Sequence, residues 1–246
     1  MSFFEVSILI LVILIFLLIF TILILNFYVY FGFRKEKDII RSGPSLGPEI
    51  ALTFDDGPDP RYTPKILDIL KKYKIKATFF VLGRNVKKYP ALAKRIVKEG
   101  HLIGNHSYNH ANLLLYKTKT VIRQLQKSNE IIFRVTGQYP LFFRPPRGLY
   151  DQKIARGIRK MGQRIVLWNI SSQDWRGLKG ESIAKKILKK IKGGSIILFH
   201  DSGNLVYNKE GKHENTVEAL PYVITTLKDQ DYKLVRLDEL FESENA

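Results

Sequence analysis

The 246-residue sequence contains no cysteine. Disulfide bonds and cysteine-ligated metal sites are therefore excluded, and the stability of the folded part must come from a packed core. The sequence also has no internal repeat. Its composition, with 45% hydrophobic and 26% charged residues, is that of a globular protein with room for one sizeable domain, and it excludes a disordered chain.

Basic residues are missing from the first 33 positions, and no charged residue of either sign occurs from Val6 to Phe33. The segment from Val6 to Leu25 is almost purely Ile, Leu, Val and Phe, and it matches the roughly 20 apolar residues of a membrane-spanning helix. A cleaved signal peptide is the alternative. Against it, the apolar core is long, no basic residue precedes it and no small-residue cleavage site follows it. We therefore expect a transmembrane anchor at 1–33, a Gly/Pro-containing linker at 34–48 and a folded domain at 49–246.

Positive charge is concentrated just after the predicted membrane segment. Arg34, Lys35, Lys37 and Arg41 follow it, whereas Glu5 is the only charged residue before it. Positively charged flanks usually stay in the cytoplasm, so this cluster by itself predicts a cytoplasmic domain.

Acidic residues are outnumbered in the chain, with 23 Asp and Glu against 40 Lys and Arg and a net charge of +17. Such a charge favours anionic partners, namely cell-wall polymers, lipid head groups or nucleic acid. The lysines are scattered over many segments, and no nucleic-acid-binding motif accompanies them. We therefore expect no nucleic-acid partner.

Strand-like and helix-like segments alternate after the linker, in about seven β-then-α units. The strands are continuous apolar runs, such as 50–54, 77–82 and 195–199, which are typical of a parallel sheet covered on both faces. Such a sheet is either a barrel or an open doubly wound sheet. Polar residues at or soon after the strand ends favour the barrel, because its strand ends meet at one mouth. These residues are Asp55, Asp56, His106, His110, Arg144, Asp174 and His200.

Two adjacent carboxylates, Asp55 and Asp56, end the first of these strands and are followed by a Gly-Pro turn. Neighbouring carboxylates repel each other unless a cation lies between them, so the pair indicates a metal or unequal proton affinities. The simpler interpretation is that Asp-Asp-Gly-Pro is a good turn sequence.

Two histidine patterns point to chemistry. His106 and His110 are four residues apart, a spacing that on a helical turn projects both imidazoles from one face. With a nearby carboxylate they would give three ligands suited to zinc, cobalt or iron, although they could also be polar loop residues. His200 ends a buried strand, and Asp174 could hold it as an imidazolium able to donate a proton. A hydrogen-bonded core histidine is the alternative.

Five ordered motifs resemble those of the polysaccharide deacetylases, the NodB-homology or carbohydrate esterase 4 family. They are Thr53-Phe54-Asp55-Asp56-Gly57-Pro58, His106-Ser107-x-x-His110, Arg144-Pro145-Pro146-x-Gly148, Asp174-Trp175 and Leu198-x-His200-Asp201. The resemblance covers about residues 49–240. It implies that 49–246 is a catalytic domain with the distorted (β/α) barrel of that family.

The resemblance also implies roles at the reacting centre. Asp56, His106 and His110 would bind a divalent metal, commonly zinc, with cobalt or another divalent ion as alternatives. Asp55 would be the base that deprotonates the attacking water, and Arg144 would orient Asp55.

For the leaving group, the resemblance makes His200 the acid that protonates the departing sugar amine, with Asp174 setting its pKa. Trp175 and Leu198 would line the groove that receives the acetyl methyl group. Pro146 and Arg147 would contact the substrate, and the Arg147 backbone N–H would help to stabilise the oxyanion.

Position 147 departs from the family pattern, because it is often aromatic there and is Arg147 here. An arginine could meet a lactyl or peptide carboxylate of peptidoglycan, and a solvent-exposed arginine is the alternative.

These observations predict a membrane-anchored, metal-dependent enzyme that removes N-acetyl groups from a cell-wall glycan, peptidoglycan above all, and releases acetate. The resemblance favours a domain outside the membrane, because the family's substrates lie there and large domains translocate largely regardless of flanking charge. One alternative is another barrel metallohydrolase, although the chain lacks a second carboxylate-and-histidine set for a two-metal site. The other is an inactive glycan-binding protein, although every acid and histidine of the motifs is present.

Overall fold

The structure, a computed structural model, describes residues 3–31, 39–44, 47–202 and 214–242. The chain divides into two compact units, residues 1–39 and 40–246. Residues 34–38 and 45–46 of the predicted linker lie outside the described part. The two-residue strand β1 (Ile39–Ile40) falls within the same predicted range. The division into anchor, linker and catalytic domain stays a prediction.

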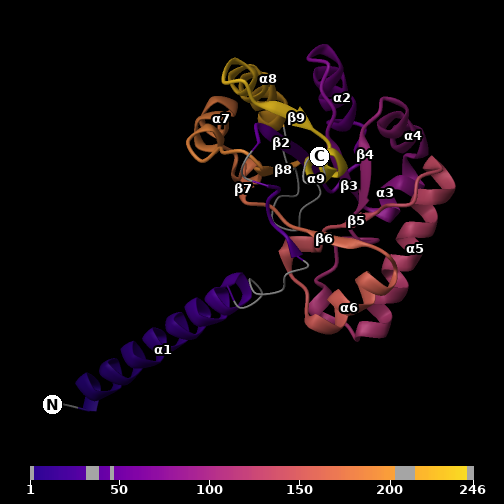
Figure 1. The fold of residues 1–246 in the computed structure, drawn as a ribbon. Helices are drawn as coiled ribbons and strands as arrows, with labels where there is room; N and C mark the ends of the chain where they lie inside the picture. Colours follow the sequence, from indigo (N-terminus) through magenta and orange to yellow (C-terminus); the bar gives the residue numbers. More distant parts are fainter. Residues whose placement is uncertain (1–2, 32–38, 45–46, 203–213, 243–246) are drawn as a thin grey trace. The chain divides into compact units, whose positions relative to one another are not determined.

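The first unit contains one long helix, α1 (Phe3–Phe31) (Figure 1). Its segment Phe4–Leu25 is 22 residues long and apolar enough to cross a membrane, and its side chains are exposed. At about 1.5 Å per residue this segment is roughly 33 Å long, close to the thickness of a bilayer's hydrocarbon core. The predicted apolar helix is confirmed, and it suits either a membrane anchor or a signal sequence.

The second unit alternates strands and helices along the chain. Its further strands are β2 (Glu49–Asp55), β3 (Thr78–Val81), β4 (Leu102–Asn105), β5 (Phe142–Phe143), β6 (Arg164–Val166), β7 (Ile170–Ser171), β8 (Ile196–His200) and β9 (Lys233–Val235). The helices are α2 (Thr63–Lys72), α3 (Gly83–Lys88), α4 (Pro90–Lys98), α5 (Thr118–Thr136), α6 (Gln152–Lys160), α7 (Gly180–Leu188), α8 (Glu214–Asp229) and α9 (Leu237–Glu242). Short 3₁₀ turns are η2 (Leu113–Leu115), η3 (Pro146–Gly148) and η4 (Asp174–Arg176).

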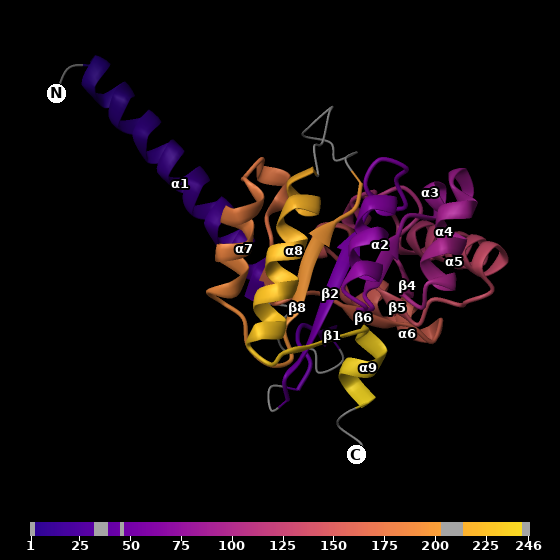
Figure 2. The ribbon, with the colours of Figure 1, turned by 90° about the horizontal axis from the view of Figure 1, so that it is seen from above.

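The described strands form one curved sheet in the order β1-β6-β5-β4-β3-β2-β8-β7, with β9 beside the start of β2. Every strand pair whose register is defined is parallel. Helices α2, α7 and α8 lie along one side of the sheet (Figure 2). The edge strands of this order are β1 and β7, and no ladder joins them among the described residues. The predicted distorted barrel is therefore confirmed in the form of a half-barrel.

Alternation along β2 decides which side chains face the helices and which face the inside of the half-barrel. Ile50, Leu52 and Phe54 pack in the large core cluster with residues of α2, α4, α7 and α8. Ala51 belongs to a separate, smaller cluster that includes residues of β3, β5, β6 and α9. Because side chains alternate, Thr53 and Asp55 share the inner face with Ala51. The strand therefore delivers a carboxylate to the inside of the half-barrel.

An aromatic stack holds the central strands together on the helix side. The Phe54 ring lies 5.0 Å from that of Phe79 on β3 and 5.7 Å from that of Phe199 on β8, between ring centroids. All three side chains are buried, and such pairs stabilise a fold beyond the area they bury. The ends of β2, β3 and β8 are thus fixed relative to one another.

One helix was not predicted from the sequence. In α3 (Gly83–Lys88) only Val86 is a buried large apolar side chain, so the segment shows little helical periodicity.

Candidate active site

The carboxyl ends of five neighbouring strands, β5, β4, β3, β2 and β8, meet at one edge of the sheet. Asp55 at the end of β2 lies opposite His200 at the end of β8. On the other side, β3 connects β2 to β4, where Asn105 lies opposite Phe143 of β5. His106 and Arg144 follow these last two strands directly. The predicted site residues therefore converge because the strands are parallel and in register.

Asp56, His106 and His110 form a triad able to hold a metal ion, with their candidate ligand atoms all within 4.8 Å of one another. The Nε2 atoms of His106 and His110 each lie 3.5 Å from Asp56 Oδ1. The expected helical turn is wrong, because residues 106–110 form an irregular loop. Ser107 at φ 72° and His110 at φ 60° turn this loop back, so both imidazoles reach Asp56 without a helix.

Burial keeps the two histidines neutral, since it lowers the pKa of His106 and of His110 to about 3. Nδ1–H of His106 donates to the Arg144 carbonyl at 2.7 Å, which leaves Nε2 with its lone pair toward Asp56. Burial also raises the pKa of Asp56 to about 7. Both Asp56 oxygens are buried and accept no hydrogen bond among the described residues. Neutral imidazoles around an unsatisfied carboxylate fit a bound divalent cation.

Asp55 has a different partner. Its Oδ1 accepts a hydrogen bond of 2.8 Å from the Arg144 guanidinium, and its Oδ2 lies 3.7 Å from His106 Nε2. Burial raises the pKa of Asp55, and the Arg144 guanidinium opposes this rise. A buried carboxylate fixed by a cation on one oxygen can accept a proton on the other.

Arg144 is fully buried and is held on every side. Its guanidinium donates to Thr53 Oγ1 at 2.7 Å and to the carbonyl oxygens of Val166 at 3.2 Å and Leu167 at 2.9 Å. It also lies 4.1 Å from the centroid of the Phe80 ring. The two carbonyls belong to the end of β6 and the link toward β7, so Arg144 satisfies backbone groups between these two strands.

His200 and Asp174 form the predicted pair. Nδ1–H of His200 donates to Asp174 Oδ1 at 2.8 Å, and the backbone N–H of His200 donates to Asp174 Oδ2 at 2.7 Å. Burial alone would lower the pKa of His200, but the carboxylate of Asp174, followed by those of Asp56 and Asp55, raises it to about 9. This raised pKa favours a charged imidazole at neutral pH, so His200 is a candidate proton donor at the site.

The predicted substrate-contacting residues lie around this centre in different environments. Trp175 is 41% exposed, with its ring edge-on to the His200 ring at 5.2 Å between centroids. Leu198 is buried opposite Thr53, on the same face of β8 as His200. Pro146 is buried in η3, and Arg147 beside it is exposed with φ at 59°.

Several residues that support the site were not predicted. Thr53 binds Arg144, and Thr216 Oγ1 donates to Asp174 Oδ2 at 2.8 Å. Asn85 Nδ2 donates to the Asp56 carbonyl at 2.8 Å. Thr53 stands inside the first motif, so its position was a usable signal. Thr216 and Asn85 lie in helices outside the motifs, and only the tertiary structure brings them to the site.

Asp201, quoted in the last motif without a role, lies behind the turn that carries Asp56. Its Oδ2 accepts a hydrogen bond of 2.6 Å from Thr63 Oγ1. A Cβ at Gly57 would come within 2.1 Å of the same oxygen, so the turn requires glycine there.

A parallel half-barrel with an Asp-His-His triad and a charged His-Asp pair at its mouth defines a class of metal-dependent hydrolases. Comparison with known proteins narrows the class. The model of the polysaccharide deacetylase family matches residues 42–166. This chain belongs to the polysaccharide deacetylase family.

Three curated relatives bear on activity. A peptidoglycan-N-acetylglucosamine deacetylase of Bacillus cereus is 40% identical over 202 residues, which cover 82% of this chain and 71% of the relative. The corresponding Listeria monocytogenes enzyme PgdA is 39% identical over 78% of this chain, which spans only 38% of that protein's length. The peptidoglycan-N-acetylmuramic acid deacetylase PdaA of Bacillus subtilis is 36% identical, covering 87% and 76%.

Two solved structures share the fold closely. The peptidoglycan N-acetylglucosamine deacetylase Bc1960 has a TM-score of 0.81 at 38% identity, covering 86% of this chain and 96% of that chain. BA3943 of Bacillus anthracis, described as a pseudoenzyme of carbohydrate esterase family 4, has a TM-score of 0.76 at 32% identity, covering 83% and 69%. A shared fold in this family therefore does not guarantee activity, and the site itself must carry the argument.

Proposed function

We propose that this protein is a metal-dependent N-deacetylase of peptidoglycan. The observation that carries the proposal is the hydrogen-bonded His200–Asp174 pair. It lies at the same carboxyl edge of the sheet as the candidate base Asp55 and the metal triad. Amide hydrolysis requires a proton donor and a proton acceptor. Here the candidate donor His200 is held by a carboxylate, and the candidate acceptor Asp55 is held by a guanidinium.

Asp56, His106 and His110 would hold the ion. Two neutral imidazoles and one carboxylate suit zinc, and cobalt or another divalent ion can replace it. When bound, the ion polarises the acetamide carbonyl and acidifies the attacking water.

Two side chains, Asp55 and His200, would each carry out one of the two proton transfers. Asp55, held by Arg144, accepts a proton from the water that adds to the acetamide carbon. His200, held charged by Asp174, gives its proton to the nitrogen as the carbon–nitrogen bond breaks, which releases a sugar amine and acetate. The Arg147 backbone N–H is a candidate to stabilise the oxyanion of the intermediate.

The substrate proposal combines the relatives with the groove. The three curated relatives are named as deacetylases of N-acetylglucosamine or N-acetylmuramic acid in peptidoglycan, and we carry this substrate class over to the present chain. Trp175 and Leu198 would receive the acetyl methyl group, and Pro146 would shape the groove beside Arg147. The exposed guanidinium of Arg147 suits a lactyl or peptide carboxylate.

We further propose that α1 is a single-pass membrane anchor and that residues 49–246 form a catalytic domain outside the membrane. The length and apolarity of α1 support the anchor, and the peptidoglycan substrate supports the outward side. The cluster Arg34, Lys35, Lys37 and Arg41 opposes it.

The test measures acetate released from N-acetylated chito-oligosaccharides and from purified peptidoglycan fragments by the full-length chain in detergent. We expect release from both, loss after chelation and recovery with zinc. Mass spectrometry of the fragments would then identify the deacetylated sugar.

Two outcomes would replace this proposal. Tight glycan binding without acetate release would favour the inactive glycan-binding alternative, and the pseudoenzyme among the solved relatives makes this control necessary. Hydrolysis of small phosphate esters or unrelated amides, with none of acetylated sugars, would favour another barrel metallohydrolase.

A further inference from the structure

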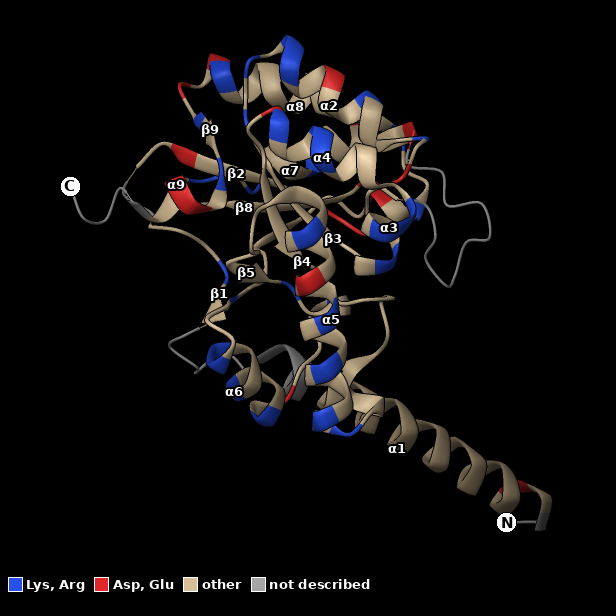
Figure 3. Cartoon of the chain, turned by 90° about the vertical axis from the view of Figure 1, so that its right-hand side faces the viewer, with Lys and Arg blue, Asp and Glu red and all other residues tan. Residues whose placement is uncertain are grey.

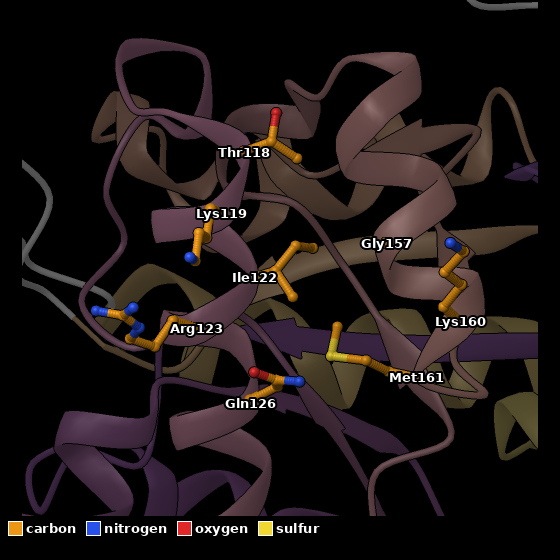
Figure 4. Close-up of a pocket in the computed structure, with 8 residues that line it drawn as sticks. All are labelled: Thr118, Lys119, Ile122, Arg123, Gln126, Gly157, Lys160 and Met161. Atoms are coloured by element: carbon orange, nitrogen blue, oxygen red, sulfur yellow. The ribbon is translucent and has the colours of Figure 1, made fainter.

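A hollow of about 460 Å³ lies between helices α5 and α6, apart from the strand edge that forms the site. Three cationic side chains line it, Lys119 and Arg123 from α5 and Lys160 from α6. Figure 4 shows Ile122 and Met161 between them, with Lys119 and Arg123 on one side and Lys160 on the other. No acidic residue lines the hollow, which therefore presents positive walls around an apolar floor.

The shape of the hollow depends on Gly157. A Cβ at this position would come within 2.3 Å of Ile122 Cδ1, so glycine lets the two helices approach at this point. Ile122 and Met161 are half-buried, whereas Lys119, Arg123 and Lys160 are exposed. The cations therefore stand above the apolar floor and can close around a bound chain.

Some cations elsewhere on this surface are paired with acids. Lys65 pairs with Glu214 at 2.6 Å, Arg95 with Asp68 at 2.5 Å and Lys185 with Glu181 at 2.6 Å. By contrast, Lys119, Arg123 and Lys160 form no ion pair with any residue in the part of the chain that the structure describes.

Like charges are also stacked along both helices. Lys119 and Arg123 are four residues apart on α5, as are Arg156 and Lys160 on α6, and such pairs repel each other. Helix α6 contains no acidic residue at all, and blue Lys and Arg segments mark both helices in Figure 3. An anion bound between the helices would relieve this repulsion.

We propose that the hollow binds a phosphodiester polymer, an anionic chain in which phosphates alternate with short carbon segments. Arginine and lysine are the usual partners of phosphate oxygens, and the apolar floor suits the carbon segments between them. A flat lipid surface fits less well, because the apolar residues lie at the bottom of a hollow and do not protrude. The site would hold the protein beside an anionic polymer independently of deacetylation.

The experiment measures binding of fluorescently labelled poly(glycerol phosphate) to the full-length chain in zwitterionic detergent by fluorescence anisotropy. The test variant combines Lys119→Gln, Arg123→Gln and Lys160→Gln. The matched control combines Lys71→Gln, Lys94→Gln and Lys98→Gln, which removes the same charge from exposed positions on α2 and α4. Circular dichroism melting of both variants checks that they remain folded.

We expect the test variant to bind roughly 100-fold more weakly at about 0.15 M salt, and the control about fivefold or less, because each cation at an anionic surface contributes about a factor of five. The parent's affinity should fall steeply with added salt, and the test variant's less steeply. Equal loss in both variants would overturn the proposal in favour of diffuse net charge. Inorganic phosphate that competes as well as the polymer, per phosphate, would also overturn it. So would binding to anionic lipid vesicles with none to the polymer.

Discussion

Asp55 and Asp56 are adjacent in the chain, yet their carboxylates have different surroundings. Asp56 is at φ 78° and turns toward the two histidines, whereas Asp55 ends the strand and is held by Arg144. One carboxylate therefore faces the candidate metal position with unsatisfied oxygens, and the other is fixed by a cation. This difference supports the proposed division into ligand and base.

The division can be tested by two substitutions. Asp56→Ala should lose metal at concentrations where the parent retains it, because it removes a ligand. Asp55→Asn should bind metal nearly normally and lose deacetylation by about 10²- to 10⁴-fold, because the amide cannot accept a proton. Metal content by mass spectrometry and acetate release would be measured in parallel. Equal metal loss in both variants, or a parental rate for Asp55→Asn, would contradict the division.

His200 should set the basic limb of the activity profile. The acid must carry its proton, so activity should fall as pH rises through the pKa of His200. That pKa is raised to about 9 chiefly by Asp174, and a bound cation would offset the smaller contributions of Asp55 and Asp56. We therefore expect the midpoint of the basic limb to lie between pH 6.5, the ordinary pKa of histidine, and about pH 9.

A pH series of kcat for the parent and for Asp174→Asn would check this. The variant should move the limb to lower pH, because it removes the main negative charge beside the imidazole. His200→Ala should retain metal and lose about 10²- to 10⁴-fold in turnover. A limb that did not move, or near-parental turnover without His200, would exclude it as the acid.

At the scale of elements, the loop after β4 carries both histidine ligands and is fixed from behind by a buried amide network. Asn105 Oδ1 accepts from Ser107 N–H at 2.7 Å, and Asn105 Nδ2 donates to Asn129 Oδ1 on α5 at 2.6 Å. Asn129 in turn donates to Gln163 Oε1 at 3.0 Å. The network ties the loop to α5 and to the start of β6.

Asn105→Ala should therefore weaken metal binding by about 10- to 100-fold, because groups that orient ligands contribute on that scale. The control is Asn169→Ala, which removes a similar side-chain hydrogen bond away from the metal ligands. Asn169 Oδ1 accepts this bond from the Ile196 backbone N–H at 2.8 Å. The metal affinities of the two variants would be measured by competition with a chelating dye, and only Asn105→Ala should bind metal more weakly than the parent. If both variants bound metal equally well, the network would be structural only.

At the scale of the whole molecule, the proposed anchor and the proposed outward domain make two separate predictions. An uncleaved α1 should keep the protein in the membrane fraction after an alkaline wash, with the N-terminal residues present by mass spectrometry. A cleaved signal sequence would instead give a shorter chain outside that fraction.

Protease added to intact, wall-stripped cells should degrade an outward domain. The positive cluster after α1 predicts the opposite, since positive flanks are usually retained in the cytoplasm. Protection in intact cells with cleavage only after lysis would show that the cluster decides the topology.

The sequence by itself determined the apolar helix, the parallel character of the sheet and the residue types at the strand ends. These features are local, because contiguous apolar runs, a polar residue at a strand end and a short motif each occupy a few neighbouring positions. The residues of the metal triad and the His200–Asp174 pair could thus be predicted, although the helical turn at His106–His110 could not, because positive φ values at Ser107 and His110 replaced it.

Only the tertiary structure decided how these groups are held. Arg144 reaches Thr53 across 91 residues of sequence, and Thr63 reaches Asp201 across 138. Such contacts depend on strand order and on packing within the half-barrel, which no local pattern encodes. The same holds for the hollow between α5 and α6. Its cations are visible in the sequence, but the close approach at Gly157 that places them around one space is a property of helix packing.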